Sequence, residues 1–168
     1  MQAQDSEVTY STGEQSQLSD LWAEKPVALV FLRHLGCMFC RAHVAELRQH
    51  PEMNIVHVCN GSLSDAEDFR LEMKSPFPFI CDPEERLYDL YGLKQGDMSA
   101  LFSPKVVAGA VKNLLKGNHQ SGVKGNPKRL GGTYVVRPGG EIVWSHVGGD
   151  AADMASAESI RQALNPGA

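Results

Sequence analysis

The sequence predicts an α/β protein in which a mixed central sheet is flanked by helices on both faces. An uninterrupted apolar run, Val27 to Leu32, is typical of a strand buried on both faces, and a helical pattern separates it from a second predicted strand at 54–59. Near the C-terminus, Pro138-Gly139-Gly140 is a turn signal between two apolar segments, which indicates an antiparallel hairpin. A parallel unit and a hairpin together predict the mixed sheet.

Local signals justify the first elements. After the strand at 27–32, residues 38–50 carry apolar side chains at helical spacing and end before Pro51, which cannot continue a helix. The next strand, 54–59, stops at Asn60-Gly61, a strong turn signal. These elements complete one βαβ unit.

The middle of the chain continues the same alternation. Ser64 and Glu67 have the spacing of a capping box, which predicts a helix from Ser64 to about Lys74. A short apolar strand follows at 77–80. An Asp-Pro pair then opens a helix at 82–91, because aspartate caps a helix and proline fits its first turn.

The C-terminal part supplies the hairpin and its covering helix. The predicted strands are 133–137 and 141–146, and a helix is expected at 157–164. Residues 104–116 have an amphipathic pattern that favours one more helix.

The chain length of 168 residues predicts a single domain over 1–168. Residues 1–20 are polar and without clear periodicity, so we expect a loose N-terminal arm or a short peripheral element. Residues 97–130 read as an insertion before the hairpin. Within 101–130 all the charged residues are basic, which favours either a solvated lysine face or a surface that attracts anions: Lys105, Lys112, Lys116, Lys124, Lys128 and Arg129.

Charge and hydropathy exclude several function classes. A net charge of −4 argues against a dedicated nucleic-acid binder. The longest apolar run is far shorter than the roughly 18 residues that a membrane span needs, so no membrane association is expected. Residues 1–21 lack the basic start of a secretory signal, which makes the reducing cytoplasm the expected location.

The sequence places its most informative residues, Cys37 and Cys40, at the predicted junction between a strand and a helix. Three residues are almost one helical turn, so both sulfurs fall on one face, and Cys37 meets the unpaired N–H groups at the helix start. With Arg33 and Arg41 nearby, these groups favour the Cys37 thiolate as the attacking sulfur and Cys40 as the resolving thiol.

Two other interpretations of the pair stay open. Half of a zinc site would need two further ligands at a suitable spacing, and no second C-x-x-C motif supplies them. The pair could also be inert core cysteines. Cys59 and Cys81, each at the end of a predicted strand, read as small core residues. His34 suits either a hydrogen bond to substrate or a packing role.

The chain resembles the thioredoxin-fold superfamily of alkyl hydroperoxide reductase and thiol-specific antioxidant proteins. More closely, it is similar to the peroxiredoxin-like branch with a C-x-x-C motif that includes prostamide/prostaglandin F synthase relatives. Three stretches between about residues 27 and 150 carry the resemblance: Phe31 to Arg41, Asp82-Pro83-Glu84 with the following Tyr91-Gly92-Leu93, and Leu130 to Val136 with Pro138-Gly139-Gly140.

The resemblance implies a thioredoxin fold and thiol-based reduction of peroxides or disulfides, with no cofactor. Electrons would come from thioredoxin, glutaredoxin or a small thiol, and a homodimer is compatible with the sequence. Val30 and His34 stand where peroxiredoxins carry a proline and a threonine ahead of the attacking cysteine. Gly131 replaces an arginine of the family, so Arg129 or Arg33 would substitute for it.

The expected chemistry is oxidation of the Cys37 thiolate by a peroxide to a sulfenic acid, which Cys40 resolves as an intramolecular disulfide. We expect Arg33 to lower the Cys37 pKa, and either His34 or the backbone N–H groups around Met38 and Phe39 to orient the substrate oxygen. The remaining residues expected to bind substrate are Met38, Phe39, Arg129, Gly132 and Thr133. A protein disulfide reductase using the same pair is the first alternative. The second is a redox-silent binding module whose basic 101–130 segment meets a partner.

Overall fold

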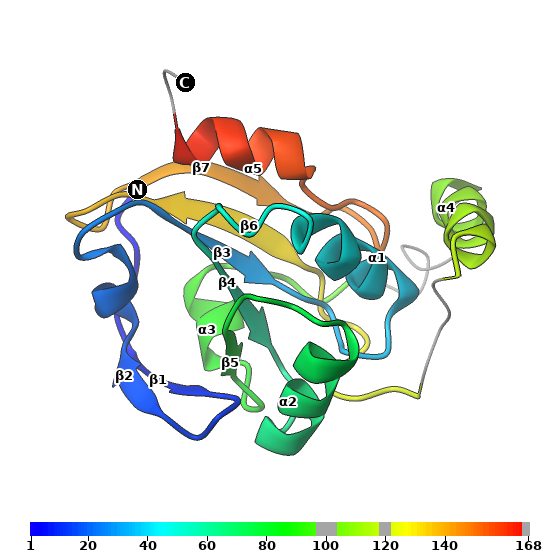
Figure 1. Cartoon of the computed structure of the whole chain (residues 1–168), viewed down its shortest axis with the longest axis horizontal. Coiled ribbons are helices and arrows are strands. Elements are labelled where there is room, and N and C mark those ends of the chain that lie inside the picture. Colours follow the sequence, from blue (N-terminus) through cyan, green and yellow to red (C-terminus); the bar gives the residue numbers. More distant parts are fainter. Residues whose placement is uncertain (97–103, 118–121, 166–168) are drawn as a thin grey trace.

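The computed structural model describes residues 1–96, 104–117 and 122–165 and contains one seven-stranded sheet in the order β2-β1-β5-β4-β3-β6-β7 (Figure 1). The strands are β1 Glu7–Tyr10, β2 Gln15–Gln17, β3 Val27–Phe31, β4 Ile55–Cys59, β5 Phe79–Cys81, β6 Gly132–Val136 and β7 Ile142–Val147. The helices are the 3₁₀ helix η1 Leu18–Trp22 and the α-helices α1 Met38–Leu47, α2 Leu63–Glu72, α3 Arg86–Leu90, α4 Pro104–Leu115 and α5 Ala157–Leu164.

The sheet is mixed, as the sequence predicts. Strands β3, β4 and β5 are parallel, whereas β1 and β6 join them antiparallel on either side. The carboxyl ends of the three parallel strands therefore meet at one edge of the sheet. In open α/β sheets this edge is where functional groups gather.

Both faces of the sheet are covered, because every residue of β3 is buried. Ala28 and Val30 point into a core beneath α1, α2 and α5. Leu29 and Phe31 point into the opposite core, beneath η1 and α3. Successive side chains along a strand point to opposite faces of the sheet, so the apolar residues of β3 are shared between the two cores.

The N-terminal residues, where the sequence predicts a loose arm or a short peripheral element, form an edge hairpin. Strand β1 pairs with both β2 and β5, and the following η1 buries Leu18 and Trp22. Polar composition hid these strands, because only a few side chains, such as Val8, face the core. Pairing with β5 supplies the backbone hydrogen bonds that propensity alone does not indicate.

Two helix starts differ from the prediction. The N-cap of α2 is Ser62, whose Oγ accepts a hydrogen bond from the Asp65 N–H, so the predicted capping box at Ser64 is displaced by two residues. Helix α3 begins only at Arg86, but the Asp82 carboxylate still accepts hydrogen bonds from the first N–H groups of that helix. Asp82 therefore caps α3 although it lies four residues before the first residue of the helix.

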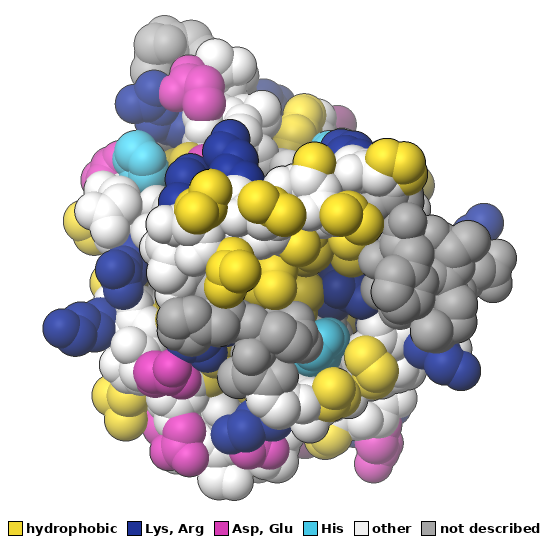
Figure 2. All heavy atoms as spheres, turned by 90° about the vertical axis from the view of Figure 1, so that its right-hand side faces the viewer, with side chains coloured by type: hydrophobic (Ala, Val, Ile, Leu, Met, Phe, Trp, Pro, Cys, Tyr) yellow, Lys and Arg dark blue, Asp and Glu magenta, His cyan; other side chains and the backbone are white. Residues whose placement is uncertain are grey.

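Helix α4 lies at the margin of the molecule and buries Val106, but several of its apolar side chains face outward. Val107, Val111 and Leu114 are each more than half exposed, whereas Gly109 approaches Phe39 of α1. Figure 2, viewed from the α4 side, shows apolar side chains gathered on this surface. The predicted insertion at 97–130 is described only over 104–117 and 122–130. Across the described residues, no helix has the length and hydropathy to cross a membrane.

The displaced cap gives a direct test of the α2 boundary. We expect Ser62→Ala to lower the free energy of unfolding by about 1 kcal/mol, the usual effect of losing a serine N-cap. Urea denaturation monitored by circular dichroism measures it. Ser64→Ala is the matched control and should change stability by less than half as much. An equal or larger effect at Ser64 would contradict this assignment.

Candidate active site

The turn from β3 to α1 brings Arg33, His34, Cys37 and Cys40 together at the carboxyl edge of the parallel strands. The Leu32 N–H still donates to the Val58 carbonyl, which extends the β3–β4 pairing by one residue before the chain turns. Cys37 is the N-cap of α1 and has an extended backbone, whereas Cys40 lies within the first helical turn. All four side chains are buried.

Arg33 contacts both sulfurs. Its Nη1 donates a hydrogen bond to Cys37 Sγ at 3.2 Å, and its backbone N–H donates to Cys40 Sγ at 3.3 Å. Cys37 is 1% exposed and Cys40 is not exposed at all. Arg41, the other expected cation, instead pairs with Glu72 on the surface. The guanidinium of Arg33 is therefore the charge that acts on Cys37.

The two thiols are set to different tasks. A hydrogen bond from the Cys40 thiol lowers the pKa of Cys37 to about 6, with help from the Arg33 charge and the N–H groups of Phe39 and Cys40, although burial opposes it. Burial, and then the bond to Cys37, raises the pKa of Cys40 well above its ordinary value. Cys37 is thus a thiolate at neutral pH, and Cys40 keeps its proton.

Backbone carbonyls fix the position of the Arg33 guanidinium. Its Nη2 donates to the Pro127 carbonyl at 2.7 Å, and its Nε donates to the Arg129 carbonyl at 3.2 Å. The chain approaching Pro127 is held close by Gly125, which has a φ of +98° and packs against Asn60. A side chain at Gly125 would collide with the Asn60 amide, so glycine is needed there.

The side chain of Arg129, which the sequence predicts to bind substrate, contacts groups in and around α3. Its side chain donates to Glu85 Oε2 at 2.9 Å, to Asp89 Oδ1 at 2.5 Å and to the Leu93 carbonyl at 2.6 Å. The guanidinium is therefore committed to α3, and only its backbone carbonyl reaches Arg33. Of the two arginines that the sequence offers as a substitute for the family's arginine, Arg33 is the one whose guanidinium contacts the Cys37 sulfur.

Glu85 is the residue of this network that sequence reasoning missed. It adopts a left-handed conformation with a φ of +58°, which an ordinary residue adopts only when its surroundings hold it there. Its carboxylate accepts hydrogen bonds from Arg129, Asn60 and Asn126. The sequence contains only a weak indication of this role for Glu85, because acidic residues are common at helix starts for favourable interaction with the helix dipole alone.

His34 is buried and neutral. Burial, and then the neighbouring Arg33 charge, lowers its pKa to about 4. Its carbonyl accepts the Cys37 N–H at 3.1 Å, and among the described residues its Nδ1 atom has no hydrogen-bond partner. A buried ring nitrogen without a protein partner can bind a substrate oxygen.

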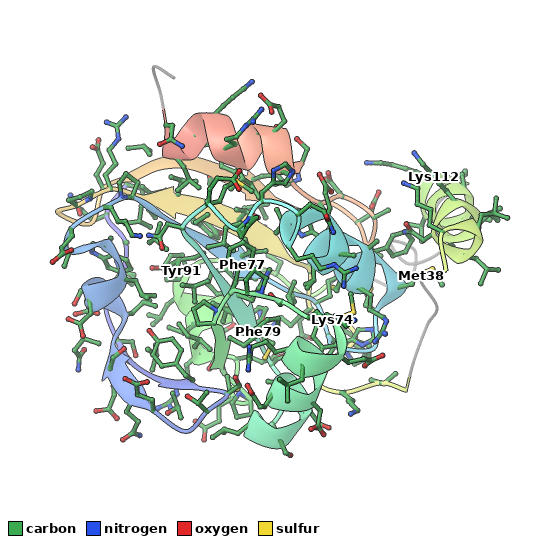
Figure 3. All side chains as sticks on the ribbon, in the orientation of Figure 1. Met38, Lys74, Phe77, Phe79, Tyr91 and Lys112 are labelled. Atoms are coloured by element: carbon green, nitrogen blue, oxygen red, sulfur yellow. The ribbon has the colours of Figure 1, made fainter. Side chains whose placement is uncertain are left out.

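The other expected substrate contacts lie on two elements around the sulfurs. Met38 and Phe39 follow Cys37 at the start of α1, and Figure 3 shows Met38 near the α4 side of the molecule. Gly132 and Thr133 lie on β6 opposite Phe31 and Val30 of β3. Gly132 thus lies beside the last residue of β3, where the chain enters the turn to α1.

Phe39 also lines a hollow of about 730 Å³ between α1 and α4. Its walls combine apolar and basic groups, Lys112 among them, which Figure 3 shows on α4. The remaining basic side chains that line it are Arg48 and Lys116. The part of α1 that lines the hollow begins at Phe39, and it also contributes the carboxylate of Glu46.

Zinc ligation would require further ligands around the cysteine pair. Over the described ranges, no three His, Cys, Asp or Glu side chains are grouped as they would be around a metal ion. The pair instead has an arginine and helix N–H groups as its neighbours, which is the environment of a redox thiolate.

The sheet order, the parallel core and a dithiol at the start of the first long helix define a thiol oxidoreductase of the thioredoxin fold. Residues 41–150, more than half of the chain, match the family model described as "AhpC/TSA antioxidant enzyme". The chain belongs to this family, which confirms the resemblance. The matched stretch begins just after Cys40, so the cysteine pair itself lies outside it.

Individual relatives agree with this assignment. The chain is 27% identical over 169 residues to human peroxiredoxin-like 2C, covering 89% of this chain and 73% of the relative. It is 28% identical over 164 residues to prostamide/prostaglandin F synthase from Salmo salar, covering 92% and 82%. A solved structure of Xanthomonas campestris peroxiredoxin Q, a cysteine-to-serine mutant, superimposes with a TM-score of 0.66 at 14% identity, covering 96% and 88%, and supports the fold.

Removing the Arg33 charge tests the electrostatics of the site. In Arg33→Met we expect the Cys37 pKa to rise by about one pH unit, because the thiolate loses its nearest cation. Thiolate absorbance during a pH titration measures it. Arg41→Met removes the same charge from a residue that bonds Glu72 and should leave the Cys37 pKa in place. An unchanged pKa in a folded Arg33→Met variant would contradict the role of Arg33.

Proposed function

We propose that this protein is a thiol peroxidase that reduces hydroperoxides through Cys37 and closes a disulfide with Cys40. The observation that carries this proposal is the Cys37 thiolate at a helix start, with the Arg33 guanidinium 3.2 Å from its sulfur and a protonated Cys40 one turn further on. A nucleophile, a cation for the developing oxygen charge and a resolving thiol all lie on the β3–α1 connection and the first turn of α1.

The first step forms a sulfur–oxygen bond. The Cys37 thiolate attacks the terminal oxygen of the hydroperoxide, the O–O bond breaks, and the alcohol leaves with the hydroperoxide's own proton. Arg33 stabilises the negative charge as it moves from sulfur to oxygen, and the partnerless Nδ1 of His34 is available to bind the substrate. Cys37 is left as a sulfenate.

The second step closes the disulfide. The Cys40 sulfur attacks Cys37 and the S–O bond breaks, while the departing oxygen takes up the Cys40 proton and leaves as hydroxide. A thioredoxin, a glutaredoxin or a small thiol then reduces the disulfide. We place the protein in a reducing compartment such as the cytoplasm, where these donors occur.

Access to the sulfur depends on local opening, because Cys37 is 1% exposed. The hollow between α1 and α4, which Phe39 lines two residues after Cys37, favours a hydroperoxide with an apolar body and an anionic group, since among the described residues three cations and one carboxylate, that of Glu46, line it. Apolar groups such as Phe39 would receive the body, and the lysines of α4 would attract the charge. An organic hydroperoxide with a carboxylate is the substrate class that this combination favours.

Disulfide exchange by the same pair is the second candidate. The feature that favours it is the missing hydroxyl: Val30 and His34 occupy the positions at which the family's peroxidases carry proline and threonine. Attack on a disulfide needs the same thiolate and resolving thiol but no hydroxyl to orient a peroxide. Rates with a hydroperoxide and with a protein disulfide therefore separate the two functions.

The central test is stopped-flow reaction of the reduced protein with a carboxylated organic hydroperoxide. We expect loss of two thiols and a Cys37–Cys40 disulfide in the peptide map. Cys37→Ser should abolish the reaction, whereas Cys40→Ser should react once and accumulate a sulfenic acid trapped by dimedone. Four unreacted thiols in the folded protein would eliminate the peroxidase function.

The pH dependence follows from the Cys37 pKa of about 6. The reactive species is the thiolate, so the rate should rise with pH through 6 and level off above about pH 7. At pH 5 it should be about tenfold below the plateau, since only about a tenth of the thiol is ionised one unit below its pKa. A profile centred near 8.5, the value of an unperturbed thiol, would contradict the assignment.

A further inference from the structure

Cys59 and Cys81 form a second cysteine pair, which the sequence did not indicate. Cys59 is the last residue of β4 and Cys81 is the last residue of β5. The two strands are parallel and neighbouring, and their register places these two cysteines directly opposite each other. Twenty-one residues separate them in sequence, so only the strand register brings them together.

Their geometry suits a disulfide. Neighbouring strands lie about 4.8 Å apart, which is within the roughly 4.4–6.8 Å between Cα atoms that disulfides span. Both side chains belong to the core on the α1–α2 face of the sheet. Phe79, two residues before Cys81 on β5, points to this same face and is labelled in Figure 3.

The two thiols differ as Cys37 and Cys40 do. Cys59 is fully buried, whereas Cys81 is 7% exposed and its sulfur lies 4.0 Å from the Ser62 carbonyl. A hydrogen bond from the Cys59 thiol lowers the pKa of Cys81, and the same bond, with burial, raises the pKa of Cys59 well above its ordinary value. Cys81 is thus the sulfur suited to attack, and Cys59 is the one suited to resolve.

We propose that Cys59 and Cys81 are a second redox-active dithiol, which exchanges with low-molecular-weight disulfides. The Cys81 thiolate attacks one sulfur of a small disulfide, forming a mixed disulfide and releasing one small thiolate. The Cys59 sulfur then attacks Cys81, which releases the second small thiol as the Cys59 proton is transferred to it. The dithiol loses two electrons, and the small disulfide becomes two thiols.

The surroundings of Cys81 favour a disulfide over a peroxide as its reaction partner. Arg33 supplies a cation at Cys37, but the charged group acting on Cys81 is the carboxylate of Glu67. Cleavage of an O–O bond develops negative charge on oxygen, which a neighbouring carboxylate disfavours. Disulfide exchange keeps the charge on diffuse sulfur and needs no oxyanion donor.

The decisive experiment treats the reduced, folded wild-type protein with bis(2-hydroxyethyl) disulfide, blocks the remaining thiols and maps the peptides by mass spectrometry. We expect a Cys59–Cys81 disulfide in addition to any Cys37–Cys40 disulfide. A background of Cys37→Ala with Cys40→Ala isolates the second pair, and it should lose both remaining thiols and contain the same cross-link.

Matched variants in this background identify the attacking sulfur. Cys81→Ser should slow the modification of Cys59 at least tenfold, because Cys59 is fully buried. Cys59→Ser should stop at a mixed disulfide on Cys81. The proposal is overturned if folded wild-type protein leaves both thiols unreacted, retains a mixed disulfide on Cys81 beside a free Cys59, or forms the cross-link only in denaturant. If the background variant does not fold, the wild-type map decides.

Discussion

The buried guanidinium of Arg33 is the interaction on which the site depends. It donates to the Cys37 sulfur and to the carbonyls of Pro127 and Arg129, so one side chain joins the first helix to the chain that precedes β6. A buried cation is stable only when it is paired and hydrogen-bonded. The carbonyls of Pro127 and Arg129 and the Cys37 thiolate together satisfy the Arg33 guanidinium, and the guanidinium in turn stabilises the thiolate.

The network behind Arg33 explains why distant segments take their conformations. Arg129 bonds Glu85 and Asp89 on α3, and it thereby fixes the backbone whose carbonyl holds Arg33. Glu85 keeps a left-handed backbone because its carboxylate has three partners. A continuous set of hydrogen bonds therefore connects α3, through the segment before β6 and Arg33, to the Cys37 sulfur.

Patterns of short range predicted much of the fold, and contacts of long range account for what they missed. The apolar run at Val27 and the helix at 157–164 were predicted closely, because periodicity and capping are local. Strand β1 and the cap at Ser62 were missed, since each depends on which partner the folded chain supplies. The role of Cys37 as the attacking thiolate could be predicted from its place at a helix start. The acidic partners of the Arg129 side chain could not be predicted, because they lie 40 or more residues away in the sequence.

The burial of Arg33 also affects the energetics of the oxidised protein. In the reduced state the cation, only 3% exposed, lies against a thiolate, whereas a Cys37–Cys40 disulfide carries no charge. Oxidation therefore leaves a positive charge in the interior beside two neutral sulfurs, which is costly in a medium of low polarity. The dithiol is favoured over the disulfide, and this raises the reduction potential of the couple, because stabilising a reduced form makes its disulfide a stronger oxidant.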